Sequence, residues 1–377
     1  MKTAIVTFIR AYNFGAVLQC YALQRAMESV GIENEVLDYY PLCFYNDYRL
    51  AANRKWSLSR RLIRNLTRFL FFPLIYRRIR HFERFISANI NLSMKQFRSN
   101  KEIENGRLDY SAYVAGSDQV WNGKLTDQDP VFFLACKGMN GKKFSYAASF
   151  GDSNVSGDLR DKYVQALSGW EGYSVREKSG AELLNQLIGV NAEVNCDPTL
   201  LLKSSDWLKL TGQRKHKKPY ILVYNVKNAE FDRLLSLAEK INSEKEMDIV
   251  MIPSVMAGKQ LLGLPARRRG YTYLSTIGPD DYLTYFHDAE YVISDSFHGT
   301  VFSLLFHKPF FVLSRFSDGS ANARANELLK LVGIQENDGT IENLDREIDW
   351  LAVDHKIAEM RKQGLSYLSH IETQINL

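Results

Sequence analysis

The sequence predicts an α/β protein made of two doubly wound domains that face a central cleft. Short apolar segments alternate with amphipathic ones in two successive runs, which is typical of parallel sheets covered by helices on both faces. The chain has 377 residues, more than a single hydrophobic core usually supports. A basic, turn-rich stretch at residues 212–219 separates the two runs, and we predict that it is a linker.

The first domain is predicted to span residues 1–211 and to begin with a strand–helix–strand unit. A strand at residues 3–9 leads through a turn into a helix at 15–30, whose apolar residues recur at helical spacing. Gly31 suits the left-handed position that ends such a helix, and a second strand follows at 35–39. Further short strands are expected at residues 110–115, 143–148, 173–175 and 193–196.

The second domain, residues 220–345, repeats this alternation. Its strands are expected at residues 220–226, 248–252, 271–277, 291–294 and 310–313. Helices are expected between them at residues 229–241, 280–289 and 300–306. A last helix at 351–377 lies in a C-terminal segment, residues 346–377, that is long enough to pack back on the first domain, although nothing in its residues decides this.

Polar turns follow several predicted strands of both domains. They hold Asn13, Ser117, Arg176 and His298. In doubly wound sheets ligands bind beyond the carboxyl ends of the strands, where these turns fall. Two domains that present such edges to each other would enclose the central cleft.

Positive charge is concentrated in one segment. Of the 48 Lys and Arg residues, nine lie in residues 54–80, which hold no acidic residue, so the other 39 face 43 Asp and Glu. Apolar residues alternate with these arginines, and we predict an amphipathic basic helix, broken at Pro73, in an insertion at about residues 45–100. Contact with an anionic membrane face and packing on the core with a solvated basic face are equally favoured. Nucleic acid is less favoured, because the aromatic residues lie in an apolar stripe.

The cysteine pattern favours a reducing compartment. Cys20, Cys43, Cys136 and Cys196 show no paired spacing, and no charged segment followed by an apolar stretch opens the chain. The apolar run at residues 69–76 is too short to cross a bilayer. We therefore expect a cytoplasmic protein.

No metal site and no nicotinamide cofactor are expected. The acidic residues and histidines show none of the spacings typical of zinc or iron sites. Asp127 and Asp129 superficially match the DxD motif of metal-dependent glycosyltransferases, but a turn entering a strand at residues 131–134 explains them more simply. Gly15 alone does not make the glycine-rich fingerprint of dinucleotide binding.

The strongest functional signal is the turn after the strand at 291–294. His298 lies at the start of a predicted helix, where backbone N–H groups attract anions. Ser296, Gly299 and Thr300 are small enough to let a phosphate or carboxylate approach the backbone. An imidazole can donate a hydrogen bond or a proton near neutral pH. A helix cap beside a core histidine is the structural alternative.

Six segments together resemble one known family. They are NFGAVLQCYALQ from Asn13, GSDQVWN from Gly116, SYAASFG from Ser145, SVREKSG from Ser174, CDPTLLL from Cys196 and SDSFHGTVFSLLFHKPF from Ser294. Their order and spacing across residues 1–335 resemble the polysaccharide pyruvyl transferase family, with the basic insertion outside the match. The resemblance implies a GT-B-like fold of two Rossmann-like domains. It also implies transfer of a pyruvyl group from phosphoenolpyruvate to a pair of sugar hydroxyls, which forms a cyclic ketal.

This reaction sets chemical requirements for the site. Phosphoenolpyruvate carries about three negative charges, which require cations and helix N-termini. Ketal formation needs a proton for the methylene carbon, stabilisation of an oxocarbenium-like centre, removal of two hydroxyl protons and departure of phosphate. No cofactor or metal is required, because phosphoenolpyruvate is itself the donor substrate.

Three residues are the expected catalytic groups. His298 suits a phosphate contact or the general acid, and the planar fork of Arg176 matches a carboxylate or phosphate. Asp118 is the first-domain candidate for a base on the sugar. The structural alternatives are a salt bridge to Glu177 or a nearby acid for Arg176, and a loop carboxylate for Asp118, which is as well supported as the base.

Further residues are expected to bind substrate. An amide at Asn13 and a bare backbone at Gly15 could hold sugar hydroxyls or a diphosphate. Arg324 is expected to reach the donor anion, whereas Asn322 is more simply placed on a solvated helix face. The complete substrate-binding set is Asn13, Gly15, Ser117, Ser296, Gly299, Thr300 and Arg324.

The sequence thus favours an enzyme of bacterial capsule or exopolysaccharide synthesis, with the acceptor on the first domain and the donor on the second. The basic insertion suggests a lipid-linked acceptor at the inner face of the membrane. Two alternatives stay open, namely a GT-B glycosyltransferase that uses a nucleotide sugar and a non-catalytic protein that binds a glycan or lipid carrier. The acceptor sugar and the oligomeric state are not determined by the sequence.

Overall fold

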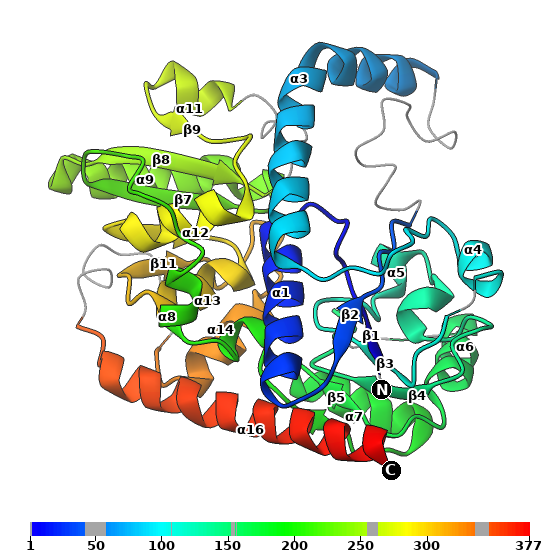
Figure 1. Cartoon of the computed structure of the whole chain (residues 1–377). Helices are drawn as coiled ribbons and strands as arrows, with labels where there is room; N and C mark the ends of the chain where they lie inside the picture. Colours follow the sequence, from blue (N-terminus) through cyan, green and yellow to red (C-terminus); the bar gives the residue numbers. More distant parts are fainter. Residues whose placement is uncertain are drawn as a thin grey trace. The chain divides into compact units, whose positions relative to one another are not determined.

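A computed structural model describes residues 2–41, 58–106, 108–151, 155, 157–254, 263–335 and 347–377. The chain divides into two compact units (Figure 1). Unit 1 consists of Met1–Phe72, Glu83–Leu202 and Met360–Leu377, and unit 2 of Pro73–Phe82 and Lys203–Glu359. Each unit has its own parallel sheet, as the alternation of strands and helices predicts.

Unit 1 has a doubly wound sheet with strand order β2-β1-β3-β4. Its strands are β1 (Thr3–Val6), β2 (Asn34–Val36), β3 (Ala112–Ala115) and β4 (Lys142–Ser145). A parallel pair, β5 (Ser174–Val175) and β6 (Glu193–Val194), continues the sheet beyond β4 through single bridges. Strand order runs outward in both directions from β1 and β3, so the switch point where such sheets bind ligands lies between these two strands.

The helices of unit 1 start with α1 (Phe14–Ser29). Asn13 caps it by accepting a hydrogen bond from Ala16 N at 3.3 Å, and Gly31 follows its end with a φ of +89°, the left-handed conformation that the sequence predicts. Figure 1 shows α1 on one side of the sheet and α5 and α6 on the other. The further helices are α4 (Asn100–Glu104), α5 (Gly123–Thr126), η1 (Pro130–Phe133), α6 (Asp158–Leu167), α7 (Lys178–Ile188) and η2 (Pro198–Leu200).

Unit 2 also has a doubly wound parallel sheet, with the different strand order β11-β10-β7-β8-β9. Its strands are β7 (Tyr220–Asn225), β8 (Asp248–Pro253), β9 (Thr272–Tyr273), β10 (Tyr291–Ser294) and β11 (Phe310–Val312). The order runs outward from β7 and β10, so the switch point of this sheet lies between them. The observed β10 has the bounds that the sequence predicts.

Helices cover both faces of the unit 2 sheet. Ile221 and Val223 of β7 pack with α9 (Phe231–Lys245), whereas Tyr224, on the opposite face, lies 5.0 Å from the ring of Tyr282 in α12 (Pro279–Asp288). The other helices are α8 (Ser204–Leu208), η3 (Asn228–Glu230), α11 (Leu264–Arg268), α13 (Phe297–Leu305) and α14 (Ala323–Leu331).

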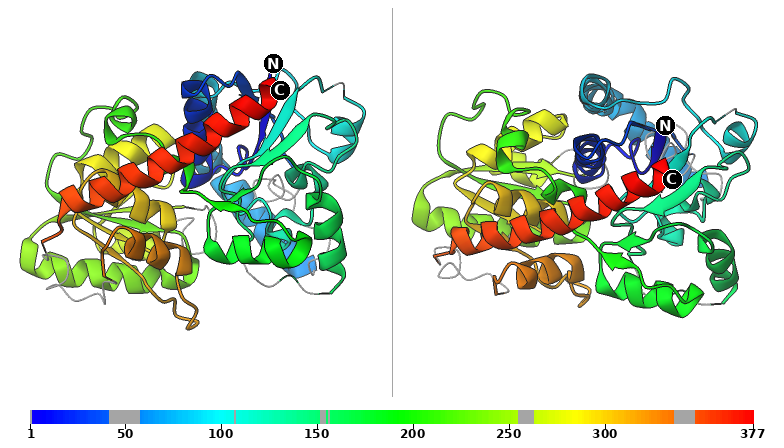
Figure 2. Two further views of the ribbon diagram at one scale, coloured as in Figure 1. Left: turned by 90° about the horizontal axis from the view of Figure 1, so that it is seen from below. Right: turned by 60° about the horizontal axis from the view of Figure 1, so that its bottom comes forward.

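Two long helices contribute residues to both units. These are α3 (Leu58–Asn89) and α16 (Trp350–Asn376). Figure 2 shows α16 as a single unbroken helix. The part of α16 in unit 1 is anchored by Arg361, which donates to Leu200 O at 3.0 Å and to Leu202 O at 3.1 Å. The stretch 212–219 belongs to unit 2, where His216 Nε2 lies 2.8 Å from Asp248 Oδ2.

Two local predictions are wrong, and a third is correct only in part. Residues 131–133 are not a strand but part of η1, because Asp129 Oδ1 accepts a hydrogen bond from Val131 N at 3.1 Å and a proline opens the turn. The strand predicted at 271–277 is only β9, since Ser275 O accepts from Arg78 instead of a neighbouring strand. Pro73 does not end α3, which continues through it as one helix, but Figure 1 shows this helix sharply bent, as an interior proline causes.

Candidate active site

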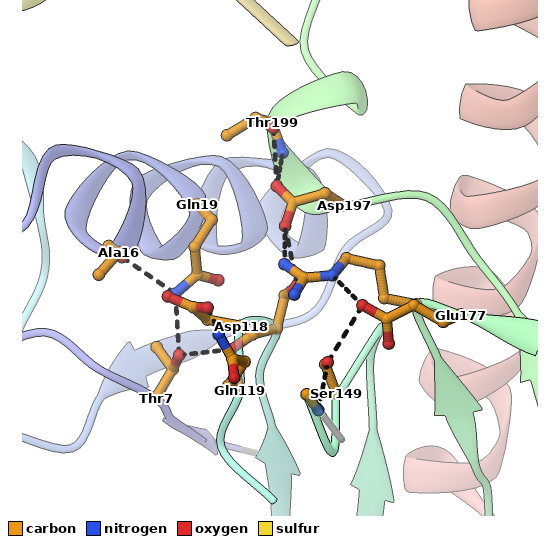
Figure 3. Close-up of polar contacts among 12 residues, drawn as sticks. Thr7, Ala16, Gln19, Asp118, Gln119, Ser149, Glu177, Asp197 and Thr199 are labelled. Atoms are coloured by element: carbon orange, nitrogen blue, oxygen red, sulfur yellow. Dashed lines mark hydrogen bonds and ion pairs between the residues drawn. The ribbon is translucent and has the colours of Figure 1, made fainter. Parts of the chain in front are cut away.

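Hydrogen bonds tie the start of α1 to the switch point of unit 1. Thr7 follows β1 and Ser117 follows β3, and Thr7 Oγ1 donates to Ser117 O at 3.0 Å. Gln19 of α1 donates its Nε2 to Thr7 Oγ1 at 2.8 Å (Figure 3). These contacts are buried, so they fix the helix against the carboxyl ends of β1 and β3.

Asp118 has a left-handed backbone directly after this switch point. Its φ is +70°, which is uncommon for a residue with a Cβ atom, and its Oδ1 accepts a hydrogen bond from Gln119 N at 2.9 Å. Its main-chain oxygen accepts from Ser149 N at 3.0 Å. The residue is partly exposed, so its carboxylate is both held in place and reachable from solvent.

Asn13 and Gly15 lie at the N-terminus of α1, as expected. Asn13 is partly exposed and its Oδ1 serves as the helix cap, while Gly15 is buried. The structure therefore gives Asn13 a structural role, and the contact of either residue with a substrate stays a prediction.

Arg176 follows β5 and is held by two carboxylates. Its Nε donates to Glu177 Oε1 at 2.9 Å, and its Nη1 donates to Asp197 Oδ2 at 3.0 Å. Burial alone would lower the pKa of Arg176, but the charges of Glu177, Asp197 and Asp118 raise it above its ordinary value. These ion pairs are those of the structural alternative, whereas binding of a substrate anion stays a prediction.

Hydroxyl groups fix the two carboxylates around Arg176. Ser117 Oγ donates to Asp197 Oδ2 at 3.0 Å, and Thr199 Oγ1 donates to Asp197 Oδ1 at 2.7 Å. Ser149 Oγ donates to Glu177 Oε1 at 3.1 Å (Figure 3). Ser117 therefore connects the switch point with the ion pairs of Arg176. The expected residues Ser117, Asp118 and Arg176 are brought together in unit 1.

Sequence reasoning missed the role of Asp197. It lies inside the CDPTLLL segment, directly after a predicted strand, and Asp before Pro is a frequent start of a turn. The aspartate does cap η2, because Thr199 N donates to its Oδ1 at 3.0 Å. Its position after a strand at the ligand-binding edge was the available signal.

A second ion-pair cluster that the sequence did not reveal lies in the loop between β1 and α1. Arg10 donates Nε and Nη2 to the two oxygens of Asp38 at 2.7 and 2.6 Å, and Nη1 to both oxygens of Glu83 at 2.6 Å. Tyr12 OH also donates to Glu83. Burial alone would lower the pKa of Arg10, but Asp38 and Glu83 raise it. As with Arg176, one guanidinium faces two carboxylates.

The switch point of unit 2 is filled by Asp295, which sequence reasoning also missed. Its Oδ1 accepts from Val226 N at 2.7 Å, and its Oδ2 accepts from Lys227 N at 2.7 Å and from Asn225 Nδ2 at 3.1 Å. Burial raises the pKa of Asp295 to about 6, although the N–H groups of Lys227 and Val226 oppose the shift. The carboxylate thus joins the end of β10 to the end of β7.

His298 is the second residue of α13. Ser296 caps this helix, because its Oγ accepts from Gly299 N at 3.3 Å and its main-chain oxygen accepts from Thr300 N at 3.0 Å. The imidazole is buried, with its ring 5.2 Å from that of Phe297. The four residues expected in this turn therefore lie together at one helix N-terminus, where the helix dipole favours negative charge.

Close packing explains Gly299. A Cβ atom on this residue would lie 2.4 Å from Ser294 Oγ and 3.2 Å from Tyr224 Cδ1. The first turn of α13 therefore lies directly on the ends of β10 and β7. The glycine is required by this helix–strand contact, whether or not a ligand approaches its backbone.

Asn322 and Arg324 lie at the start of α14. Asn322 is buried and donates its Nδ2 to Leu313 O at 2.9 Å and to Asp295 O at 3.4 Å. The prediction that it lies on a solvated helix face is wrong, because its side-chain amide is buried and donates hydrogen bonds to these carbonyl groups. Arg324 is partly exposed, and its contact with a donor anion stays a prediction.

An arginine of α3 enters the same edge of unit 2. Arg78 is fully buried, with Nη1 donating to Pro253 O at 3.1 Å and to Ser275 O at 3.2 Å, and Nη2 to Ser254 O at 2.5 Å. These carbonyl groups lie at or beyond the carboxyl ends of β8 and β9. Arg78 is therefore no part of a solvated basic face, although its neighbour Arg77 is exposed.

The remaining predicted features concern metals, thiols and membranes. In the part of the chain that the structure describes, no group of three or more His, Cys, Asp or Glu is placed to hold a metal ion. Cys20 and Cys136 are buried as free thiols and Cys196 is partly buried, while Cys43 lies outside the described residues. Among the described helices, none is long and apolar enough to cross a bilayer.

Known proteins resemble the chain in family and in fold. A model of the polysaccharide pyruvyl transferase family matches residues 13–317, most of the chain. No curated protein sequence matches it. The UDP-GlcNAc 2-epimerase of Methanocaldococcus jannaschii, solved with UDP-GlcNAc and UDP, is 12% identical with a TM-score of 0.52 over 99% of this chain and 100% of that chain. The UDP-GlcNAc 2-epimerase of Neisseria meningitidis, solved with UDP-GlcNAc, is 12% identical with a TM-score of 0.51 over 100% of this chain and 99% of that chain.

These similarities confirm the predicted fold class. The solved structures have the GT-B fold, so the chain is an α/β protein of two Rossmann-like domains. At 12% identity the similarity shows the fold alone. That the two domains face a central cleft stays a prediction.

Proposed function

The chain belongs to the polysaccharide pyruvyl transferase family, and from this premise we propose that it moves the pyruvyl group of phosphoenolpyruvate onto a pair of sugar hydroxyls. The product is a cyclic ketal on a glycan of a bacterial capsule or exopolysaccharide. Family membership supports a transferase enzyme. The donor, the acceptor and the ketal are the proposal.

The observation that best supports this proposal is the difference in charge between the two ligand edges. In unit 1, Arg10 and Arg176 each face two carboxylates, and Asp118 adds a further negative charge nearby. An edge with more carboxylates than cations repels an anion but accepts hydrogen bonds from hydroxyl groups. Unit 1 is therefore suited to a neutral sugar.

The edge of unit 2 offers positive charge instead. It combines the N-terminus of α13 with an exposed Lys227 and the buried Arg78. Carbonyl oxygens accept from Nη1 and Nη2 of Arg78 without cancelling its charge. The acid at the switch point, Asp295, has its carboxylate oxygens occupied by the N–H groups of Val226, Lys227 and Asn225. A small anion with a phosphate and a carboxylate is favoured here.

His298 is the proposed general acid. Its place in the first turn of α13 puts the imidazole among N–H groups that would hold the donor's phosphate or carboxylate. A proton from the imidazole adds to the methylene carbon of phosphoenolpyruvate and leaves an oxocarbenium-like carbon. Ser296, Thr300 and Arg324 are proposed to contact the donor anion, with Gly299 shaping the turn.

Asp118 is the proposed base on the acceptor. It takes a proton from one sugar hydroxyl, whose oxygen bonds to the oxocarbenium-like carbon, and a second hydroxyl then displaces phosphate and closes the ketal ring. One proton enters the methyl group and two leave the hydroxyls, one of which departs with hydrogen phosphate. Asn13, Gly15 and Ser117 are proposed to contact the sugar. Arg176 is proposed to keep Asp197 and Ser117 in place beside Asp118.

A lipid-linked acceptor at the inner face of the membrane is the proposed setting. The exposed face of α3 carries Phe72 and Tyr76, 44% and 48% exposed, with Arg80 5.9 Å over the Tyr76 ring. Aromatic and basic residues on one helix face are typical of interfacial binding. The side chains of Arg60, Arg61, Arg64 and Arg68 lie outside the described residues. Neutralising these four arginines should weaken co-sedimentation with anionic vesicles, and equal partitioning would remove the membrane claim.

The test of the proposed function is phosphate release that depends on both substrates. The purified chain is incubated with phosphoenolpyruvate and a panel of oligosaccharides and lipid-linked sugars, and the products are analysed by mass spectrometry for a gain of one pyruvyl group. Binding of a uridine diphosphate sugar, and none of phosphoenolpyruvate, would favour the glycosyltransferase alternative. Glycan binding without turnover of any donor would favour the non-catalytic alternative.

A further inference from the structure

Arg78 lies on the face of α3 that packs into unit 2. Ile75, Arg78 and Phe82 follow one another at spacings of three and four residues, so they share one side of the helix, and all three are buried. The guanidinium lies 5.2 Å from the centre of the Phe82 ring. On the other side of the same helix, Arg77 and Arg80 are exposed.

The burial of Arg78 is costly and therefore needs an explanation. Removing a guanidinium from water costs several kcal/mol before its contacts are counted. A methionine would fill similar space without that cost. Three main-chain carbonyl oxygens of Pro253, Ser254 and Ser275 receive the N–H groups, and all lie at the carboxyl edge of the sheet. The contacts thus fix a positive charge at the edge where the switch point also lies.

A buried tyrosine lies between this charge and the first turn of α13. Tyr224 is buried on β7, and a Cβ atom on Gly299 would lie 3.2 Å from its Cδ1. The side chains of Ser254 and Ser296 lie close enough to its hydroxyl to lower its pKa. Burial raises the pKa of Tyr224 to about 12, and these side chains and the charge of Arg78 oppose the shift. Ser254 is also the residue whose carbonyl accepts from Arg78 at 2.5 Å. Ser254, Tyr224 and Ser296 therefore lie next to one another between Arg78 and the first turn of α13.

We propose that Arg78 is a positioning residue of the donor site, which stabilises a bound anion through its charge and orients the Ser296 cap through Ser254 and Tyr224. The inference rests on the proposed function for the identity of the donor. It assigns a role in donor binding to a segment from the first half of the chain, residues 73–82, that belongs to unit 2. The basic helix α3 then has two kinds of arginine, those exposed to solvent and one that serves the site.

The inference is tested by anion binding to four variants of the whole chain. The probes are phosphoenolpyruvate and inorganic phosphate, measured by titration calorimetry, together with the KM values for donor and acceptor. Arg78→Gln keeps an amide donor but loses the charge, and we expect about a tenfold weaker affinity for both anions with an unchanged acceptor KM. Arg78→Lys, which keeps the charge, should remain within about threefold of the wild type.

Two further variants separate the site from the helix. Tyr224→Phe removes the hydroxyl group and should weaken anion binding about threefold with little loss of stability. Arg77→Gln is the matched control, because it removes a neighbouring exposed charge, and it should bind as the wild type does. If Arg78 has only a general structural role, Arg78→Gln should unfold at a lower temperature, and its KM values for donor and acceptor should either change together or stay unchanged. That result would overturn the inference.

Each remaining outcome has a defined meaning. If Arg78→Gln does not fold, wild-type anion affinity of Tyr224→Phe overturns the inference, whereas donor-specific weakening of Tyr224→Phe supports it. If the wild type binds inorganic phosphate but not phosphoenolpyruvate, the proposed function fails, and the inference is decided by the phosphate affinities alone. If the wild type binds neither anion, both are overturned.

Discussion

Both sheets are parallel and doubly wound, although their strand orders differ, and their carboxyl edges hold arginine in different ways. In unit 1, Arg10 and Arg176 are each paired with two carboxylates. In unit 2, Arg78 is bonded to main-chain carbonyl oxygens, and a helix N-terminus capped by Ser296 lies at the same edge. One domain therefore pairs the arginines of its carboxyl edge with carboxylates, whereas the other bonds its arginine to carbonyl groups.

This difference teaches that the strand order selects where ligands bind but not which ligands. The switch point lies between the first and third strands of unit 1 and between the first and fourth strands of unit 2. Side chains reach these carboxyl edges from loops, from α1 and from α3. The net charge at each edge depends on which partners those side chains meet. We therefore expect substitutions in the two units to affect donor and acceptor separately.

The largest effect is expected from His298→Ala. Loss of the general acid should lower turnover by about 10²- to 10⁴-fold, because proton transfer to the methylene carbon would then depend on solvent. Steady-state phosphate release and thermal unfolding are measured together, with His287→Ala, an exposed histidine of unit 2, as the control. Near-normal turnover of a folded His298→Ala protein would return this residue to the role of a helix cap.

Asp118→Asn should come next and should act on the acceptor alone. Asparagine adopts left-handed backbone conformations readily and can still accept from Gln119 N, so the substitution removes the charge with little change in shape. We expect kcat to fall about 100-fold while the affinity for phosphoenolpyruvate is unchanged. Asp127→Asn, at another left-handed aspartate of unit 1, is the matched control. A parallel loss of donor affinity would break the separation between the two edges.

The raised pKa of Asp295 predicts a pH dependence of stability in unit 2. The folded protein binds the proton of Asp295 up to about pH 6, whereas the unfolded chain releases it near 3.8. This contribution to stability is therefore fully present below the unfolded pKa and is lost as the pH rises through the folded pKa, by about 3 kcal/mol at most. Asp295→Asn cannot ionise, so its free energy of unfolding relative to the wild type should improve between pH 4 and 7. Denaturant titrations at several pH values measure this, and a constant difference would refute the assignment.

The smallest effect is expected from Arg176→Lys, and it decides between two roles. Lysine keeps the charge but cannot donate to Glu177 and Asp197 with a planar fork, so the free energy of unfolding should fall by about 1–3 kcal/mol. If the arginine is only structural, the KM for phosphoenolpyruvate stays within about twofold. A raised donor KM at unchanged stability would instead support the anion contact that the sequence suggests, and unit 1 would no longer be purely an acceptor edge.

The sequence predicted the elements and the places where polar residues follow them. Alternation of apolar segments was enough for β10 and for the strand–helix–strand opening, because such patterns are local. The turns at Ser117, Arg176 and His298 were identified for the same reason. Wrong predictions of single elements also have local causes. The strand expected at residues 131–134 is replaced by η1, because Asp129 caps a helical turn there.

The sequence did not predict which residues the buried arginines contact. Arg10 meets Glu83 across 73 positions, and Arg78 meets Ser275 across 197. Nothing in the neighbouring residues tells whether an arginine will face carboxylates, carbonyl groups or water, because that depends on which chain segments pack beside it.

The sequence by itself determined two parallel α/β sheets, the strand ends that carry polar turns, and the family to which these turns belong. Only the tertiary structure decided which charged groups lie at the carboxyl edge of each sheet. It also decided that Arg78 of α3 is buried in unit 2. The physical reason is that secondary structure follows periodic patterns of a few residues, whereas the electrostatics of a site follows from burial and from ion pairs between residues far apart in the chain.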